Sequence, residues 1–154
     1  MYLAIEFMDA GSGVRLITRG KVPGALIVDA HRIFADKHLD AFARARYWFA
    51  NHSALEAVLL QHSHARSVAT IDARLATANP GLVVGSLVPG DLEFGMVRTW
   101  QSLADQTGWR VGTFRDEQGL QTFFEETLGM NVNPHGPADG PPVVVYEDSI
   151  TSVS

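Results

Sequence analysis

Histidine and serine alternate in a short polar stretch, "QHSH" at residues 61–64, which follows a second histidine–serine pair, "NHS" at residues 51–53. Imidazole nitrogens bind zinc and other divalent ions, so His52, His62 and His64 are candidate metal ligands. No HExxH motif accompanies them, and side chains two residues apart diverge at the start of a helix. We therefore expect no bound metal and no cofactor.

Ser63 lies where a helical pattern begins, because apolar residues follow at positions 65, 68, 71, 75 and 78. A hydroxyl at a helix start accepts a hydrogen bond from a free backbone N–H, which is the role of an N-cap. A phosphoserine at the same place would be stabilised by the helix dipole. The sequence leaves both roles open for Ser63.

The serines also raise the question of hydrolysis. A serine nucleophile in an α/β hydrolase sits in a G-x-S-x-G turn, and neither "AGSGV" nor "VGSLV" has that frame. We predict no catalytic residue and a protein that is not an enzyme.

Composition narrows the class of protein. The chain has 154 residues, a net charge of −5 and no cysteine, which indicates one globular domain without disulfides or thiolate metal sites. Its basic residues are scattered, so we expect no nucleic-acid partner. No apolar run is long enough to span a bilayer, and the N-terminal stretch lacks a basic leader. A cytoplasmic location is the expectation.

The elements that must position these residues alternate between strand and helix. Strands are predicted at residues 2–8 and 14–18 (a hairpin), 45–51, 82–88 and 109–114. Helices are predicted after Pro23, from Ser63 to "NPG" at 79–81, after Asp91, and from Asp116 to Gly129. Asp91 and Asp116 are the expected N-caps of the last two helices, and Leu92 is expected on the apolar face of the helix that follows Asp91. Trp48, Trp100 and Trp109 are expected to fill the core. The pattern predicts an α/β fold with a five-stranded mixed sheet and about four helices packed against it.

One segment resembles a known family. Residues 71–116, "IDARLATANPGLVVGSLVPGDLEFGMVRTWQSLADQTGWRVGTFRD", are similar to the helix–NPG–strand–helix–TGW–strand sequence of the STAS superfamily. The resemblance covers roughly residues 2–128 and is strongest to small bacterial proteins that are like anti-sigma-factor antagonists. It implies a STAS-like domain over residues 1–129. In signalling members a serine is phosphorylated where the third strand meets the next helix, and Ser63 takes that position here, without the family's Asp and Gly.

The resemblance favours a non-enzymatic regulatory or assembly module that acts through protein contacts or self-association. The alternative is a small-molecule or lipid binding domain with a pocket under the helices. An enzyme that uses the histidines and Ser63 ranks third. An apolar cavity larger than a packed core leaves would favour the binding domain.

Two further regions are candidates for contact with partners or ligands. Asp91, Phe94 and Asp116 lie on loops at the carboxyl ends of predicted strands, where ligands bind in open α/β sheets. Residues 130–154 are predicted to be a Pro/Gly-rich linker and a tail. The apolar residues of that tail, Val143, Val144, Val145 and Tyr146, have strand propensity. Either they belong to a disordered terminus, or they add to a sheet edge of this chain or of a partner.

Overall fold

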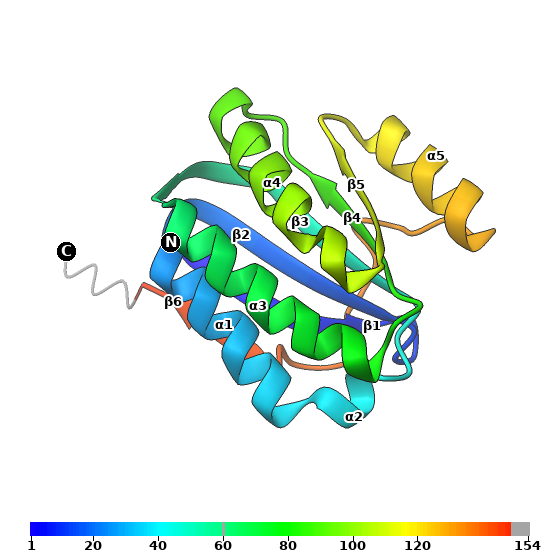
Figure 1. Ribbon diagram of the computed structural model, residues 1–154. Helices are drawn as coiled ribbons and strands as arrows, with labels where there is room; N and C mark the ends of the chain where they lie inside the picture. Colours follow the sequence, from blue (N-terminus) through cyan, green and yellow to red (C-terminus); the bar gives the residue numbers. More distant parts are fainter. Residues whose placement is uncertain (60, 149–154) are drawn as a thin grey trace.

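A six-stranded mixed sheet forms the centre of the computed structural model, which describes residues 1–59 and 61–148 (Figure 1). The strand order is β5-β4-β3-β2-β1-β6. The strands are β1 (Tyr2–Met8), β2 (Gly13–Pro23), β3 (Tyr47–Leu59), β4 (Val83–Leu87), β5 (Arg110–Phe114) and β6 (Val144–Glu147). Strands β2 to β5 run parallel to one another, and β1 pairs antiparallel with both β2 and β6.

Helices cover both faces of this sheet. They are α1 (Gly24–Lys37), the short α2 (Leu39–Phe42), α3 (His62–Ala78), α4 (Asp91–Leu103) and α5 (Glu117–Leu128), with a 3₁₀ turn at Ala104–Thr107. Figure 1 shows α1, α3 and α4 side by side across one face, while α5 lies apart from them. None of these helices is long and apolar enough to cross a membrane.

The two faces have separate hydrophobic cores because side chains alternate along a strand. Trp48 and Ala50 of β3 belong to the core under α1 and α3. Tyr47 and Phe49 point the other way and pack with Phe124 of α5. The expected α/β fold, with a mixed sheet that begins with an N-terminal hairpin, is confirmed.

The expected number of five strands is wrong, because the end of the described chain supplies a sixth. Residues 130–143 cross the face of the sheet that α5 shares, and Val132 is fully buried there. Arg15 donates hydrogen bonds to the carbonyls of Pro134 and Gly136 at 3.2 and 2.6 Å. Strand β6 then pairs with β1 of the same sheet.

Strand β3 is longer than expected because it continues beyond the aromatic run at its start. The stretch after Asn51, whose pattern is ambiguous in the sequence, pairs with the second half of β2 through two register shifts. Beyond Asn51 and Leu87, β3 and β4 no longer pair. This extension carries His52 and Leu55 beyond the C-terminal end of β4.

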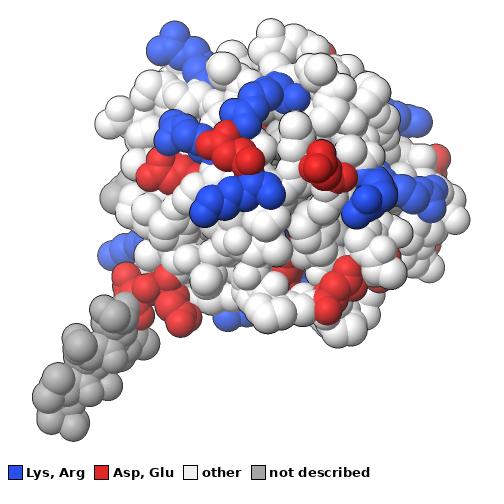
Figure 2. Space-filling model, turned by 90° about the horizontal axis from the view of Figure 1, so that it is seen from below, with Lys and Arg blue, Asp and Glu red and all other residues white. Residues whose placement is uncertain are grey.

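Charge is mixed on the surface. On the face drawn in Figure 2, the described Lys and Arg side chains are interspersed with Asp and Glu, with no continuous basic area among them. Exposed ion pairs such as Arg32–Asp29 and Arg74–Asp36 follow the same pattern. The basic side chains on this face are therefore dispersed rather than clustered.

Candidate functional site

The floor of a cavity is formed by small side chains in the middle of the sheet. Trp48, Ala50 and His52 alternate along β3 and so face the same side. Ala50 pairs with Leu16 on one neighbouring strand and with Ser86 on the other. Because the side chains of Ala50 and Ser86 are short, they rise less far from the sheet than the side chain of Trp48 does. A space therefore remains between them and the helices.

The roof is formed by α1, α3 and α4, each of which turns one titratable side chain inward. His31, Asp72 and Glu93 occupy positions on the apolar stripes of these helices and are only 6 %, 3 % and 8 % exposed. Such positions are normally filled by aliphatic residues, because burial of a titratable group costs free energy. Three independent helices therefore place polar groups above the same low floor.

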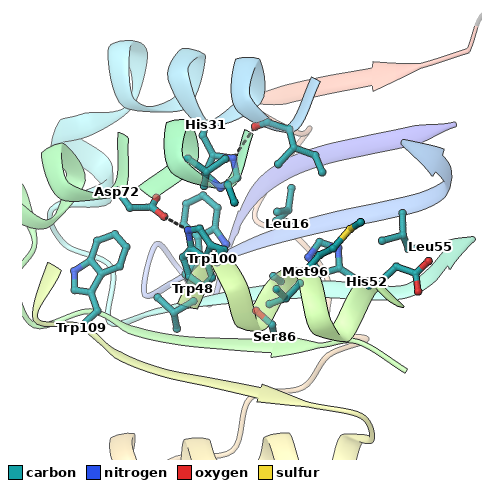
Figure 3. Close-up of a pocket in the computed structure, with 17 residues that line it drawn as sticks. Leu16, His31, Trp48, His52, Leu55, Asp72, Ser86, Met96, Trp100 and Trp109 are labelled. Carbon is teal, nitrogen blue, oxygen red and sulfur yellow. Dashed lines mark hydrogen bonds between the residues drawn. The ribbon is translucent and has the colours of Figure 1, made fainter. Parts of the chain in front are cut away.

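Between floor and roof lies a cavity of about 90 Å³ (Figure 3). This is several times the roughly 10–15 Å³ that admits one water molecule. Figure 3 shows Asp72 and Trp109 toward one end, His52 and Leu55 toward the other, and Trp48 and Trp100 between them. Half-exposed residues such as Leu55, Met96 and Val97 form part of the wall, so the cavity reaches the surface beside α4.

All three tryptophans of the chain line this cavity. The indole N–H of Trp100 donates to Asp72 Oδ2 at 2.8 Å, and that of Trp109 donates to the carbonyl of Asn79 at 2.8 Å. The ring of Trp48 stacks on His31 with centroids 5.6 Å apart. The expectation that the tryptophans fill the core is correct for Trp48, whereas Trp100 and Trp109 are only partly buried and form walls.

The protonation of His31 follows from its hydrogen bond. Its Nδ1 lies 2.7 Å from the carbonyl oxygen of Ile27, and a carbonyl only accepts, so Nδ1 carries the proton. Burial lowers the pKa of His31, which leaves the ring neutral at pH 7. The other nitrogen, Nε2, is then a bare acceptor that has no hydrogen-bond partner within the described chain.

His52 is a second neutral histidine in the cavity wall, at the end that Leu55 also lines. Its Nδ1 shares a hydrogen bond of 2.6 Å with the hydroxyl of the buried Thr18. Burial, helped by the neighbouring His31, lowers the pKa of His52 to about 4. Both histidines therefore line the cavity without positive charge at neutral pH.

Asp72 is the most strongly perturbed carboxyl group. Burial raises its pKa to about 7, an effect that the hydrogen bond from Trp100 only partly opposes. Among the described residues, its second oxygen has no hydrogen-bond partner, and no occluded side-chain polar atom lacks one. Oδ1 therefore keeps some contact with open space, in agreement with its place in the cavity wall.

Glu93 lies in the first turn of α4, with its carboxylate against Gly90. A β-carbon added at Gly90 would clash with Oε2 of Glu93, so the glycine leaves room for this carboxylate. The negative charge is stabilised by the N-terminal end of the helix dipole. Within the described chain, neither carboxylate oxygen of Glu93 takes part in a hydrogen bond.

These groups are suited to binding. In the described part of the cavity no histidine bonds to Ser86 or to a carboxylate, so no nucleophile–base pair is assembled. The described residues also contain no group of three His, Asp or Glu side chains that could hold a metal ion. What the arrangement offers is an aromatic, mostly apolar space with a few polar groups directed into it.

The predicted histidine cluster is not brought together. His52 lines the cavity, whereas His62 is exposed at the start of α3 and His64 accepts a hydrogen bond from the backbone N–H of Gln61 at 3.0 Å. The N-cap of α3 is Gln61, which forms a capping box with His64. The N-cap role considered for Ser63 is wrong, because the cap lies two residues earlier, at Gln61, and Ser63 is in the exposed first turn of the helix.

The predicted loop ends gather elsewhere. Asp91 forms an ion pair with Arg115, whose guanidinium lies 4.4 Å from the ring centroid of Phe94. Asp91 is the first residue of α4 and Gly90 is its N-cap, which corrects the expected cap. Asp116 is confirmed as the N-cap of α5 and accepts from the Gly119 N–H at 2.8 Å. None of the three loop-end residues lines the described cavity.

The predicted tail contact occurs within one chain. Val144, Val145 and Tyr146 lie in β6 and pair with β1, with Val144 buried and Val145 51 % exposed. The backbone N–H of Val143 donates to the carbonyl of Ile5 at 2.9 Å. The docking of these residues on a separate partner stays a prediction.

Sequence reasoning missed His31, Asp72, Ser86 and Glu93. A signal was present for the three helical residues, since each follows the helical spacing of apolar neighbours that are buried or partly buried. These neighbours are Val28 before His31, Ala65 and Val68 before Asp72, and Val97 and Trp100 after Glu93. The expected inward residue of α4, Leu92, is instead 64 % exposed. A titratable residue on the apolar face of a helix indicates either a buried polar group with a structural role or part of a binding site.

Comparisons with known proteins do not name this arrangement. No protein-family model matches the sequence, and no curated protein matches it significantly.

Proposed function

We propose that this protein binds a small, mostly apolar molecule in the cavity between the sheet and helices α1, α3 and α4. The observation that carries the proposal is that one buried titratable residue from each of these helices, His31, Asp72 and Glu93, lines the same space. A core without a ligand gains nothing from three such groups, because each costs free energy to bury.

The shape and position of the cavity support the same function. Ligand sites are concave, largely apolar and lined by aromatic side chains with few polar groups, as here. Ligands in open α/β sheets bind beyond the carboxyl ends of parallel strands. His52 follows the last residue of β3 that pairs with β4, and Ser86 precedes the last residue of β4, so the cavity extends to that edge.

Tryptophan fluorescence tests the proposal directly, because all three tryptophans of the chain line the cavity. Small aromatic and aliphatic probes should change the indole emission in a saturable manner. The control is Ala50→Leu, which fills the floor of the cavity without adding a charge. Binding that is equally strong in wild type and in Ala50→Leu would place the ligand elsewhere and refute the proposal.

The second candidate function is the regulatory or assembly module that the STAS resemblance favours. Two exposed hydrophobic side chains, Leu92 on α4 and Val145 on β6, support it, as does the exposure of Ser63 in the first turn of α3. Native mass spectrometry of wild type and Val145→Asp tests it. An oligomer that is lost in the variant supports assembly through β6, and a monomer in both contradicts it.

A further inference from the structure

We propose that the molecule bound in the cavity is a small ammonium ion, an amine with a short aromatic or alkyl body. This inference rests on the proposed binding function and names the class of ligand. Its basis is the hydrogen-bonding inventory of the cavity wall, in which fixed acceptors outnumber fixed donors.

The fixed acceptors come from the three helices. His31 Nε2 has a lone pair because Nδ1 holds the proton that is donated to Ile27. Asp72 Oδ1 and the carboxylate of Glu93 have no hydrogen-bond partner within the described chain, and a carboxylate that is ionised only accepts. These three residues are each more than nine-tenths buried, so the groups are built into the wall.

Few donors remain to balance them. The indole N–H groups of Trp100 and Trp109 are already used by Asp72 and by the carbonyl of Asn79. Among the described wall residues, the indole N–H of Trp48 is the fixed donor left over, while Ser86 and His52 adapt to either role. A ligand that donates hydrogen bonds therefore satisfies more of the wall than one that accepts them.

Charge leads to the same conclusion. The described wall contains Asp72 and Glu93 but neither lysine nor arginine, and both histidines are neutral. An anion would be repelled, whereas a cation would gain charge-assisted hydrogen bonds. The faces of Trp48, Trp100 and Trp109 also attract a cation, because their π electrons are negative. An ammonium group close to Asp72 and Trp100 meets both requirements.

Matched probes separate this proposal from binding by shape alone. Benzylamine, benzyl alcohol and benzoate have similar size and differ in charge and in hydrogen-bonding groups, and butylamine, 1-butanol and butyrate form a smaller set. Each is titrated into the protein at pH 8 and followed by tryptophan emission. The amines should bind about tenfold more tightly than the matching alcohols, and the acids should bind most weakly.

Two variants test the cause of that preference. Asp72→Asn keeps the acceptor for Trp100 and removes the charge, and Glu93→Gln does the same for the second carboxylate. Each should reduce the tenfold preference for the amine and leave the affinity for the alcohol nearly unchanged. Asp36→Asn removes an exposed charge that pairs with Arg74 and serves as the matched control. An amine preference that survives in both cavity variants overturns the proposal.

The outcomes separate two questions: whether the cavity binds a ligand, and whether that ligand is an ammonium ion. If alcohols or acids bind as tightly as amines, and Ala50→Leu blocks them all, the cavity binds ligands but the ammonium class is wrong. If no probe binds, or if Ala50→Leu leaves the binding unchanged, both the class and the binding function are wrong.

Discussion

The indole N–H of Trp100 donates to the carboxylate of Asp72 over 2.8 Å, and this bond joins α4 to α3 across the roof of the cavity. It gives a buried carboxylate one strong partner and leaves the other oxygen directed at open space. The pair thus combines a structural contact between helices with a polar group that is available to a ligand.

Asp72→Asn should make the unliganded protein more stable at pH 8, by about 1–3 kcal/mol. Burial raises the pKa of Asp72 to about 7, against 3.8 for a free side chain. Between these values the folded chain holds a proton that the unfolded chain has lost, so the contribution of Asp72 to stability falls as pH rises from about 4 to about 7. Asparagine removes this cost and still accepts from Trp100. Urea unfolding across this pH range measures the difference.

The stability gain of Asp72→Asn should depend on pH. Below pH 4 both the folded and the unfolded wild-type chain protonate Asp72, so the variant should lose its advantage there. Asp36→Asn, an exposed substitution, should show no comparable trend. A stability gain for Asp72→Asn that is the same at pH 4 and pH 8 would contradict the buried, perturbed carboxyl.

Ala50→Leu should leave the free energy of unfolding unchanged or raise it by up to about 1 kcal/mol, because the added methyl groups enter existing space. In a filled core the same change would be destabilising by about 1–3 kcal/mol. Ala76→Leu, on a buried face of α3 outside the cavity wall, is the control and should be destabilising. Thermal unfolding of the two variants decides between a cavity and a closely packed core.

Arg15→Met should destabilise the protein by about 3 kcal/mol or more. Arg15 and Glu6 form a buried ion pair at 2.5 Å, with both side chains 9 % exposed. Removal of the arginine leaves the Glu6 carboxylate without its partner and frees the carbonyls of Pro134 and Gly136. Hydrogen exchange should increase along residues 133–139. Loss of stability without faster exchange there would show that this segment is held by other contacts.

Helix caps give a matched pair of mild substitutions. Asp116→Ala should cost about 1 kcal/mol, because Asp116 accepts from the Gly119 N–H at the start of α5. Ser63→Ala should change stability by less than about 0.5 kcal/mol, since Ser63 lies exposed within the first turn of α3 and Gln61 is the cap. Chemical denaturation measures both. A larger effect at Ser63 than at Asp116 would contradict the assigned caps.

Local pattern was sufficient for most of the fold. The apolar run at residues 82–88, the "NPG" stop after α3 and the Asp116 cap are short-range signals, and each has its expected structure. The sequence showed the strand propensity of residues 143–146 but did not place them in the predicted sheet, because β6 has only four residues and is held by pairing with β1, which is far away in the sequence. Short strands are specified by their partners more than by their own residues.

The site was harder to predict because its residues do not form a motif. "QHSH" drew attention as a cluster in sequence, yet its histidines diverge at a helix start while His52 faces the cavity from β3. His31, Asp72 and Glu93 lie on three helices, and only the packing of those helices brings them to one space. The register of α4 was also decisive, since it turns Glu93 inward and Leu92 outward.

The most direct measurement of the central claim is the indole region of a ¹H–¹⁵N spectrum, which contains one N–H signal for each of Trp48, Trp100 and Trp109. During titration with benzylamine we predict saturable shifts of these signals, largest for Trp48 and Trp100, and their absence in Ala50→Leu. Indole signals that stay in place while backbone signals elsewhere shift would show that the cavity is not the binding site.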